Sequence, residues 1–243
     1  MTRSVGATET AFCRDPEVLH ALASVVVPAL AAGSAPGVPL RAWSIDCARG
    51  PEAWSLAALL ATRLPRERTI ELLGTDPDPV ALEVARAATY EASALERVPH
   101  HLGVREWFES LPGTGQVRAR AALRERVRFA VHDLVGEGLV PRDVSPGWFD
   151  LVACRGVLGR LEPALRQKAL GRLATILRPG GALVLGQAEG GLLAADRHFQ
   201  PFPRLLMPGE PPPEGAAAPP PAPKPAPRKD AGRGGRKDAP GTR

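Results

Sequence analysis

Acidic and small residues follow two apolar segments of this sequence at a spacing that suits nucleoside binding. Asp46 and a short turn ending at Gly50 come after the apolar residues 40–45, and Asp76 comes after residues 69–74. A small-residue turn at a helix start lets backbone N–H groups approach a ligand, and an acid after the second strand can accept ribose hydroxyls. Taken singly, these features also fit an ordinary turn and a turn Asp. Together they predict a site for a nucleoside cofactor.

Polar residues also follow two later apolar segments. Asp133 and Leu134 come after the apolar residues 127–131, where a polar side chain can meet the amino group of adenine. Arg155 and Gly156 directly follow the next apolar segment. Ligands of parallel sheets bind at the carboxyl ends of the strands, so all of these residues are candidates for one site.

Alternating strands and helices must position these residues. Short apolar runs predict strands at 40–45, 69–74, 127–131, 149–154 and 182–185. Helical periodicity predicts helices over 16–33, with Asp15 as N-cap, and over 51–65, 80–88 and 163–177, the last ended by Gly180 and Gly181. Apolar strands that alternate with helices indicate an α/β fold with a doubly wound, mostly parallel sheet. Residues 89–120 are expected to form a small inserted subdomain, with helical pieces around 93–98 and 102–111.

Composition divides the chain of 243 residues into a body and a tail. Residues 208–243 hold 11 of the 27 prolines and +3 of the net charge of +5, and they contain no aromatic residue. Such a segment cannot bury enough apolar area to offset its ordering entropy, so we predict a disordered tail after a domain spanning residues 1–207. The basic tail invites a nucleic-acid hypothesis, but no basic patch is interleaved with aromatic residues. We favour a solvated tether and expect no specific nucleic acid partner.

The cysteines support neither a disulfide framework nor a metal site. Cys13, Cys47 and Cys154 are far apart, and no C-x-x-C or Cys/His cluster occurs. The first ten residues contain no hydrophobic signal core, and the longest apolar run, 21–32, is too short to span a bilayer. We therefore expect a cytoplasmic protein with no metal and no membrane insertion.

Several motifs occur together and in order along the body. Residues 10–16 read Thr-Ala-Phe-Cys-Arg-Asp-Pro, and residues 41–52 read Arg-Ala-Trp-Ser-Ile-Asp-Cys-Ala-Arg-Gly-Pro-Glu. Gly-Thr-Asp follows at 74–76, Cys-Arg-Gly-Val-Leu at 154–158 and Gly-Gln-Ala-Glu at 186–189. A helix followed by Arg-Pro-Gly-Gly before an apolar strand, as at 178–181, is characteristic of Class I S-adenosylmethionine methyltransferases. The whole set resembles the catalytic domain of the CheR-type chemotaxis methyltransferases.

The resemblance implies a Rossmann-like fold, the cofactor S-adenosylmethionine and methyl transfer to a glutamate carboxylate of a chemoreceptor or related signalling protein, by a monomer. It makes Arg14 the catalytic residue that orients the acceptor carboxylate. Arg160 is a second candidate, although a surface position is the favoured interpretation there. Glu52 would hold the amino group of the cofactor, and Asp76 its ribose. The full set of implied cofactor-binding residues is Thr10, Arg14, Asp46, Gly50, Glu52, Asp76, Asp133, Leu134, Arg155 and Gly156.

The chain departs from the family pattern at several of these positions. Asp46 replaces a Gly, Asp133 and Gly156 each replace an Asn, and Arg160 stands where a site Tyr is expected. Further replacements lie in the first turn, at Ala48, Arg49 and Pro51. The alternative is therefore a catalytically degenerate regulatory or scaffold module with weak or no cofactor turnover. A nucleic-acid methyltransferase is a third hypothesis, which no N-P-P-Y-type element supports.

Overall fold

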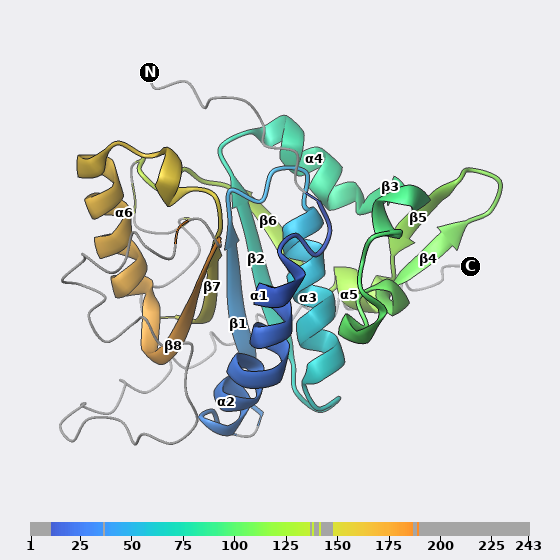
Figure 1. Cartoon of the computed structure of the whole chain (residues 1–243), viewed down its shortest axis with the longest axis horizontal. Helices are drawn as coiled ribbons and strands as arrows, with labels where there is room; N and C mark the ends of the chain where they lie inside the picture. The colour runs from blue at the N-terminus through green and yellow to red at the C-terminus, as the bar shows by residue number, and fades with distance from the viewer. Residues whose placement is uncertain are drawn as a thin grey trace, which may run out of the picture.

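Five parallel strands form the centre of the computed structural model, which describes residues 11–35, 37–136, 138, 141, 148–186 and 189 (Figure 1). Their spatial order is β6-β2-β1-β7-β8, and each neighbouring pair runs parallel. The predicted doubly wound α/β fold of the Rossmann-like type is therefore confirmed. The strands are β1 (Leu40–Ile45), β2 (Ile70–Asp76), β6 (Val127–Val131), β7 (Phe149–Cys154) and β8 (Leu177–Leu185).

Side chains of the central strands alternate between two hydrophobic cores, one on each face of the sheet. Ala42 of β1 belongs to the larger core, whereas Trp43 and Ile45 belong to the smaller one. Trp43 stacks on Phe149 of β7 with ring centroids 5.2 Å apart, which ties the two strands together on that face. Because both faces are covered, β1 and β7 are apolar along nearly their whole length.

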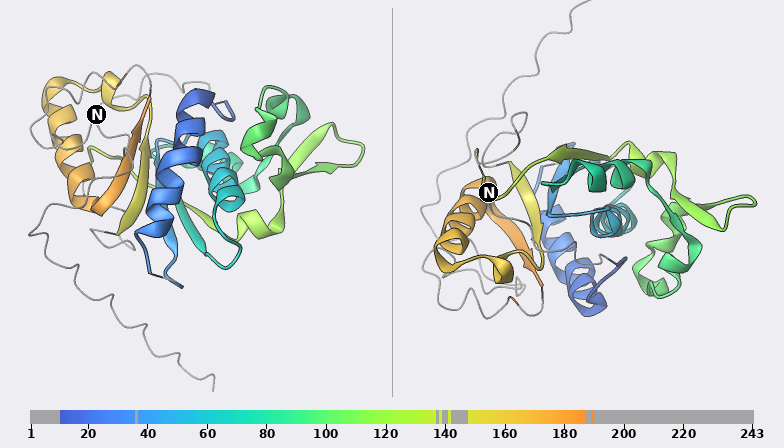
Figure 2. Two further views of the ribbon diagram at one scale, coloured as in Figure 1. Left: turned by 60° about the horizontal axis from the view of Figure 1, so that its bottom comes forward. Right: turned by 90° about the horizontal axis from the view of Figure 1, so that it is seen from above.

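Helices cover both faces of the sheet (Figure 2). The larger core is closed by α3 (Pro51–Arg63) and by α1 (Pro16–Ala21), which continues through a π-helical turn (Leu22–Val26) into α2 (Val27–Ala32). The other core is closed by α6 (Pro163–Ile176). Two further helices are α4 (Pro79–Ala87), which contacts β2 and β6, and the short α5 (Ala121–Arg124). Each of α1, α3, α4 and α6 has a Pro in its first turn, where the missing N–H has no helical partner to lose.

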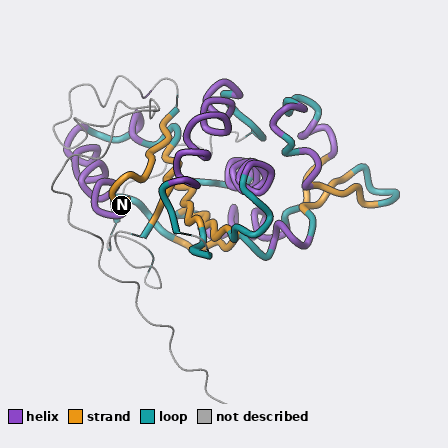
Figure 3. Tube along the Cα trace, turned by 90° about the horizontal axis from the view of Figure 1, so that it is seen from below, coloured by secondary structure: helices purple, strands orange, loops and turns teal. Residues whose placement is uncertain are grey.

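Residues 89–119 contain a second, antiparallel sheet that projects from the body (Figure 3). Its strands are β3 (Thr89–Glu91), β4 (Phe108–Leu111) and β5 (Gln116–Ala119), in the order β3-β5-β4. The expected helical piece over 102–111 is wrong in its second half, because Phe108 pairs with Ala119 and Leu111 with Gln116 across a hairpin. Between β3 and β4 the helical pieces are short 3₁₀ turns, at Ala92–Leu95, His100–Leu102 and Arg105–Trp107.

Two predicted helix ends also need correction. The last helix ends at Ile176, and Gly180 and Gly181 lie inside β8, which has a register shift against β7. Asp15 does not cap α1, since its side chain makes no capping hydrogen bond and its backbone is left-handed. The carboxylate of Asp15 instead contacts a distant strand end, as described below.

The predicted tail, residues 208–243, lies outside the described residues, and so does Thr10. Within the part of the chain that is described, no helix is long and apolar enough to cross a membrane.

Candidate functional site

The carboxyl ends of β1, β2, β6 and β7 meet at one edge of the sheet, and each is followed by polar residues from the predicted set. β1 and β7 are neighbours, with Trp43 beside Val152. The chain continues from β1 to β2 and β6 on one side, and from β7 to β8 on the other. The boundary between β1 and β7 is therefore the switch point, and the crevice outside such a point is where ligands of open α/β sheets bind.

The turn between β1 and α3 has an unusual backbone. Asp46 and Ala48 adopt left-handed conformations, with φ of 52° and 47°. The Ala48 N–H donates to Oδ2 of Asp76 at 2.8 Å, and the Tyr90 hydroxyl donates to the Arg49 carbonyl at 2.7 Å. Hydrogen bonds from β2 and β3 thus stabilise a turn in which two residues other than glycine have strained, left-handed backbones.

Gly50 closes this turn and starts α3 with φ of 95°. A Cβ at this position would lie 2.9 Å from both the Ala85 Cβ and the Tyr90 hydroxyl oxygen. Only glycine combines that backbone angle with that approach, so the predicted importance of Gly50 has a structural reason. Its position also places the first turn of α3, including Glu52, at the ligand edge.

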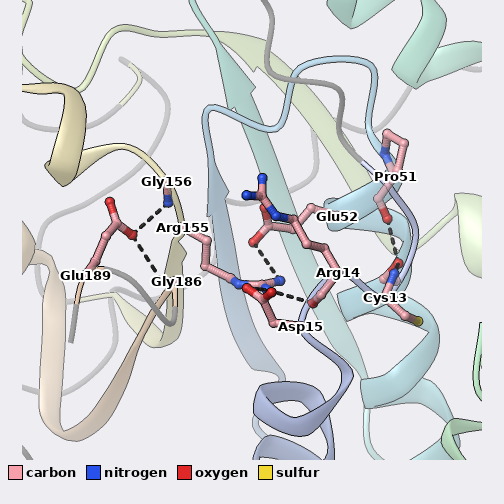
Figure 4. Close-up of polar contacts among 10 residues, drawn as sticks. Cys13, Arg14, Asp15, Pro51, Glu52, Arg155, Gly156, Gly186 and Glu189 are labelled. Carbon is pink, nitrogen blue, oxygen red and sulfur yellow. Dashed lines mark hydrogen bonds and ion pairs between the residues drawn. The ribbon is translucent and has the colours of Figure 1, made fainter.

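Arg155 connects three separate segments at this edge (Figure 4). Its guanidinium donates to Oδ2 of Asp15 at 2.7 Å and to the Arg14 carbonyl at 2.6 Å. Another nitrogen of the same group lies 3.7 Å from Oε1 of Glu52, within ion-pair range but too far for a hydrogen bond. The Arg155 side chain is only 6% exposed, so this charge is buried and is balanced by two carboxylates.

The loop before α1 presents Arg14. Cys13 and Asp15 both have left-handed backbones, with φ of 49° and 51°. The Cys13 N–H donates to the Ser55 hydroxyl at 3.0 Å, while Arg155 holds the two residues that follow. Arg14 itself is exposed, and its side chain extends toward the Glu52 carboxylate. A strained loop fixed at both ends therefore directs one arginine at the site.

Glu52 is the most perturbed carboxyl group of this cluster. Burial raises its pKa to about 7, against the opposing effect of Arg155 and Arg14. Its Oε1 atom is buried without a hydrogen-bond partner among the described residues. A buried carboxylate oxygen that lacks a partner fits a ligand that donates hydrogen bonds, in particular an ammonium group.

Three acids line the other half of the edge. Asp76 is 8% exposed, and its two oxygens accept from the N–H groups of Ala48 and Asp78. Burial, Asp76 and Asp133 raise the pKa of Asp46 to about 6, although Arg160 opposes them. Oδ2 of Asp46 lies 3.1 Å from Nη2 of Arg160 in an ion pair. Asp133 is exposed and accepts from the Val135 N–H at 3.0 Å, while Leu134 is buried.

Glu189 shapes the loop after β7. Its buried carboxylate accepts from the backbone N–H groups of Gly156 at 2.7 Å, Gly159 at 3.0 Å and Gly186 at 3.0 Å. Gly156 has φ of 73°, and Gly and Asn are the residues that tolerate such angles best. The replacement of the family's Asn by Gly156 therefore preserves this backbone.

The structure thus brings nine of the predicted site residues to one edge, with Thr10 outside the described part. Sequence reasoning missed Asp15, Ser55, Tyr90 and Glu189, which hold the site without belonging to the predicted set. Asp15 and Glu189 both lie inside quoted motifs, directly after Arg14 and three residues after Gly186, so an acid inside a motif was the available signal.

Cys13, Cys47 and Cys154 are buried and free, and burial raises the pKa of each thiol above its ordinary value. No group of three or more His, Cys, Asp or Glu side chains within the described ranges is arranged to hold a metal ion.

Comparison with known proteins identifies related sequences. A family model described as CheR methyltransferase, SAM binding domain, matches residues 8–203. A chemotaxis protein methyltransferase of Vibrio parahaemolyticus is 29% identical over 185 residues, covering 74% of this chain and 64% of that protein. A probable biofilm formation methyltransferase, WspC, of Pseudomonas putida is 34% identical over 189 residues, covering 76% of this chain and 42% of that protein.

One further relative and one solved structure match over part of their length. An uncharacterized 104.1 kDa protein of Rhodobacter capsulatus is 34% identical over 183 residues, which are 74% of this chain but 18% of that protein. The chain therefore spans less than two thirds of the length of these three relatives. Among solved structures, the glycopeptide N-methyltransferase MtfA complexed with sinefungin matches with a TM-score of 0.42 and 15% identity, covering 74% of this chain and 52% of that one.

Proposed function

The chain belongs to the CheR methyltransferase family, and on that premise we propose that it methylates a carboxylate side chain of a partner protein. Its cofactor is S-adenosylmethionine, since the matched family domain is a SAM-binding domain. The names of the relatives point to chemotaxis and biofilm signalling. The proposed acceptor is therefore a glutamate of a chemoreceptor or of a related signalling protein.

The residues present fit this cofactor. Oε1 of Glu52, buried and without a hydrogen bond, suits an ammonium group. Each carboxylate oxygen of Asp76 accepts one hydrogen bond from the backbone. A carboxylate has about four acceptor positions, so ribose hydroxyls can still donate to it. Gly50 leaves the start of α3 without a side chain. Asp46 and Arg160 add charges that the family pattern lacks, and they pair with each other.

The observation that carries the proposal is the presentation of Arg14. Its backbone is fixed by Arg155 and by the neighbouring bond from Cys13 to Ser55, while its side chain remains exposed at the site. A guanidinium binds a carboxylate through two parallel hydrogen bonds and so fixes its orientation. Arg14 is therefore proposed to hold the acceptor carboxylate.

The chemistry needs little from the protein beyond this orientation. When bound, the cofactor supplies an activated methyl group. A glutamate acceptor has a pKa of about 4.3 and is ionised at neutral pH, so no residue has to act as a general base. Alignment of two bound reactants can contribute about 7–11 kcal/mol. Arg14 would align the acceptor, while Glu52 and Asp76 would hold the cofactor.

Calorimetric titration with S-adenosylmethionine tests the cofactor assignment. We expect saturable binding by the wild type and a loss of at least tenfold in affinity for Asp76→Ala. Because this change also leaves two backbone N–H groups unpaired, thermal unfolding of the variant is measured in parallel. Glu83→Gln, an exposed change on α4, is the matched control. If the wild type shows no saturable binding below millimolar concentration, the proposed enzyme activity is refuted and a scaffold module is favoured.

A second experiment tests Arg14 separately. Arg14→Gln keeps the loop backbone that Arg155 binds and removes the exposed charge. Because Arg14 also acts on the Glu52 carboxyl, calorimetry with S-adenosylmethionine on the same variant shows whether cofactor binding is unchanged. With a carboxylate-bearing receptor fragment as acceptor, we expect methyl incorporation to fall at least tenfold. Incorporation at the wild-type rate would contradict the role of Arg14 in orienting the acceptor.

A further inference from the structure

An ion pair bridges the switch point of the sheet. Asp46 is the first residue after β1, and Arg160 ends a short 3₁₀ turn (Leu158–Arg160) that follows β7. Their side chains meet at 3.1 Å between Nη2 and Oδ2. Because β1 and β7 are the two strands that flank the switch point, the pair spans the edge at which the cofactor is proposed to bind.

Both partners depart from the family pattern, in which a Gly and a Tyr are expected at these positions. The resembled sequence motif supplies neither charge, so the pair is a property of this chain. It is also partly exposed, with 25% of the Asp46 side chain and 42% of the Arg160 side chain accessible. A structural role alone would give this pair little value, since exposed ion pairs contribute about 0–1 kcal/mol.

The surroundings of Asp46 are strongly acidic. Asp76 and Asp133 act on it with like charge, and Arg160 is the cation that opposes them. Glu52 lies at the same sheet edge, at the start of α3. The site therefore concentrates negative charge at this edge of the sheet, and Arg160 partly neutralises it.

The reaction changes the charge of the cofactor. Before transfer, the sulfur is a sulfonium cation. In the transfer the S–CH3 bond breaks, a bond forms between the methyl carbon and an acceptor carboxylate oxygen, and the sulfur keeps the electron pair. The product, S-adenosylhomocysteine, is a neutral thioether, and the acceptor becomes an uncharged ester.

We propose that Asp46 makes this site prefer the sulfonium cofactor over its neutral thioether product, and that Arg160 sets how strong this preference is. This inference rests on the proposed function, because it concerns the same cofactor site. The ion pair is then a specificity device: negative charge at the crevice retains the substrate form and releases the product form.

The two partners make opposite predictions, which separates this role from a structural one. Calorimetry gives the dissociation constants of S-adenosylmethionine and S-adenosylhomocysteine, and their ratio measures the preference. Asp46→Asn removes negative charge, so we expect the preference to fall by about threefold to tenfold. Arg160→Gln leaves Asp46 unneutralised, so the preference should rise by a similar factor. If the pair acts only as a structural link, the ratio of the two dissociation constants would change in the same direction in both variants.

Several controls keep the outcome clear. Asn tolerates the left-handed backbone of Asp46, so Asp46→Asn should keep the turn. Glu71→Gln breaks the Arg41–Glu71 ion pair, which is 3.0 Å long and lies near the opposite end of β1, and it should leave the ratio unchanged. If Asp46→Asn does not fold, the direction in which the ratio changes in Arg160→Gln still tests the inference.

Unchanged ratios in both variants, or shifts in one direction, would overturn the inference while leaving the proposed function intact. If the wild type binds neither compound, both the proposed function and this inference fail. A wild type that binds both compounds, with opposite shifts in the two variants, supports both.

Discussion

Replacing Gly50 by alanine tests the strain and crowding of the turn before α3. The residue has φ of 95°, and an added Cβ would lie 2.9 Å from the Ala85 Cβ and from the Tyr90 hydroxyl oxygen. The left-handed backbone costs an alanine about 1–2 kcal/mol. Forcing a methyl group into a packed site costs about 1–3 kcal/mol. The free energy of unfolding of Gly50→Ala should therefore fall by about 2–5 kcal/mol.

The crowding also reaches the site itself. The Tyr90 hydroxyl that the new methyl group would displace donates to the Arg49 carbonyl, so the turn loses one of its two anchors. Glu52 lies two residues further along, in the first turn of α3. We therefore expect the affinity for S-adenosylmethionine to fall together with stability.

Gly113→Ala is the matched control for this prediction. Gly113 has φ of 75° in the loop between β4 and β5, and an added Cβ there would meet no atom within 4 Å. This variant should show only the backbone cost, about 1–2 kcal/mol. Urea unfolding measures both free energies, and calorimetry measures binding. Equal destabilisation of the two variants would refute the close approach at Gly50.

Two further predictions concern buried carboxylates. Burial raises the pKa of Glu52 from its ordinary value of 4.5 to about 7 in the folded protein. The folded protein therefore binds this proton more tightly than the unfolded chain does. The free energy of unfolding should fall by about 3 kcal/mol as pH rises from about 4.5 to about 7. Glu52→Gln should lose this pH dependence. Urea unfolding at pH 5 and pH 8 measures it, and an equal change in the free energy of unfolding for the two proteins would contradict the prediction. Glu189→Gln turns an acceptor into an amide whose N–H groups face backbone donors, and should cost about 1–3 kcal/mol in thermal unfolding. The exposed change Glu83→Gln should cost nothing, and equal melting temperatures for these two variants would contradict the role of Glu189.

The sequence predicts the central sheet well because its strands are covered on both faces. Residues 40–45 and 149–154 are predominantly apolar runs, interrupted only by Arg41, Ser44 and Asp150, and the structure places β1 and β7 there with the same bounds. Residues 102–111 are harder to predict because β4 places two adjacent exposed residues, Glu109 and Ser110, after the buried Phe108, so the strand shows no regular alternation. The signal for a hairpin was the turn that contains Gly113 and Gly115, two glycines that both have positive φ.

The candidate site was predictable only in part, since a motif names residues but not their partners. Asp15 was predicted as a helix cap from its place before Pro16, a local rule. Its actual partner is Arg155, which is 140 residues away, and no local pattern contains that contact. The Asp46–Arg160 pair was equally out of reach, because its two members lie 114 residues apart.

The span of the Arg155 contacts has a consequence for how the protein comes into being. Asp15 and Arg155 are separated by 140 positions, and a chain is synthesised at about 5–20 residues per second, so about 7–30 s pass between the two. Contacts of such high sequence separation form only once the loop-closure entropy has been overcome, which slows folding. The loop that carries Arg14 therefore gains its Arg155 contacts only after β7 has been synthesised and has docked, and in a refolding experiment the fixing of this loop should coincide with that docking.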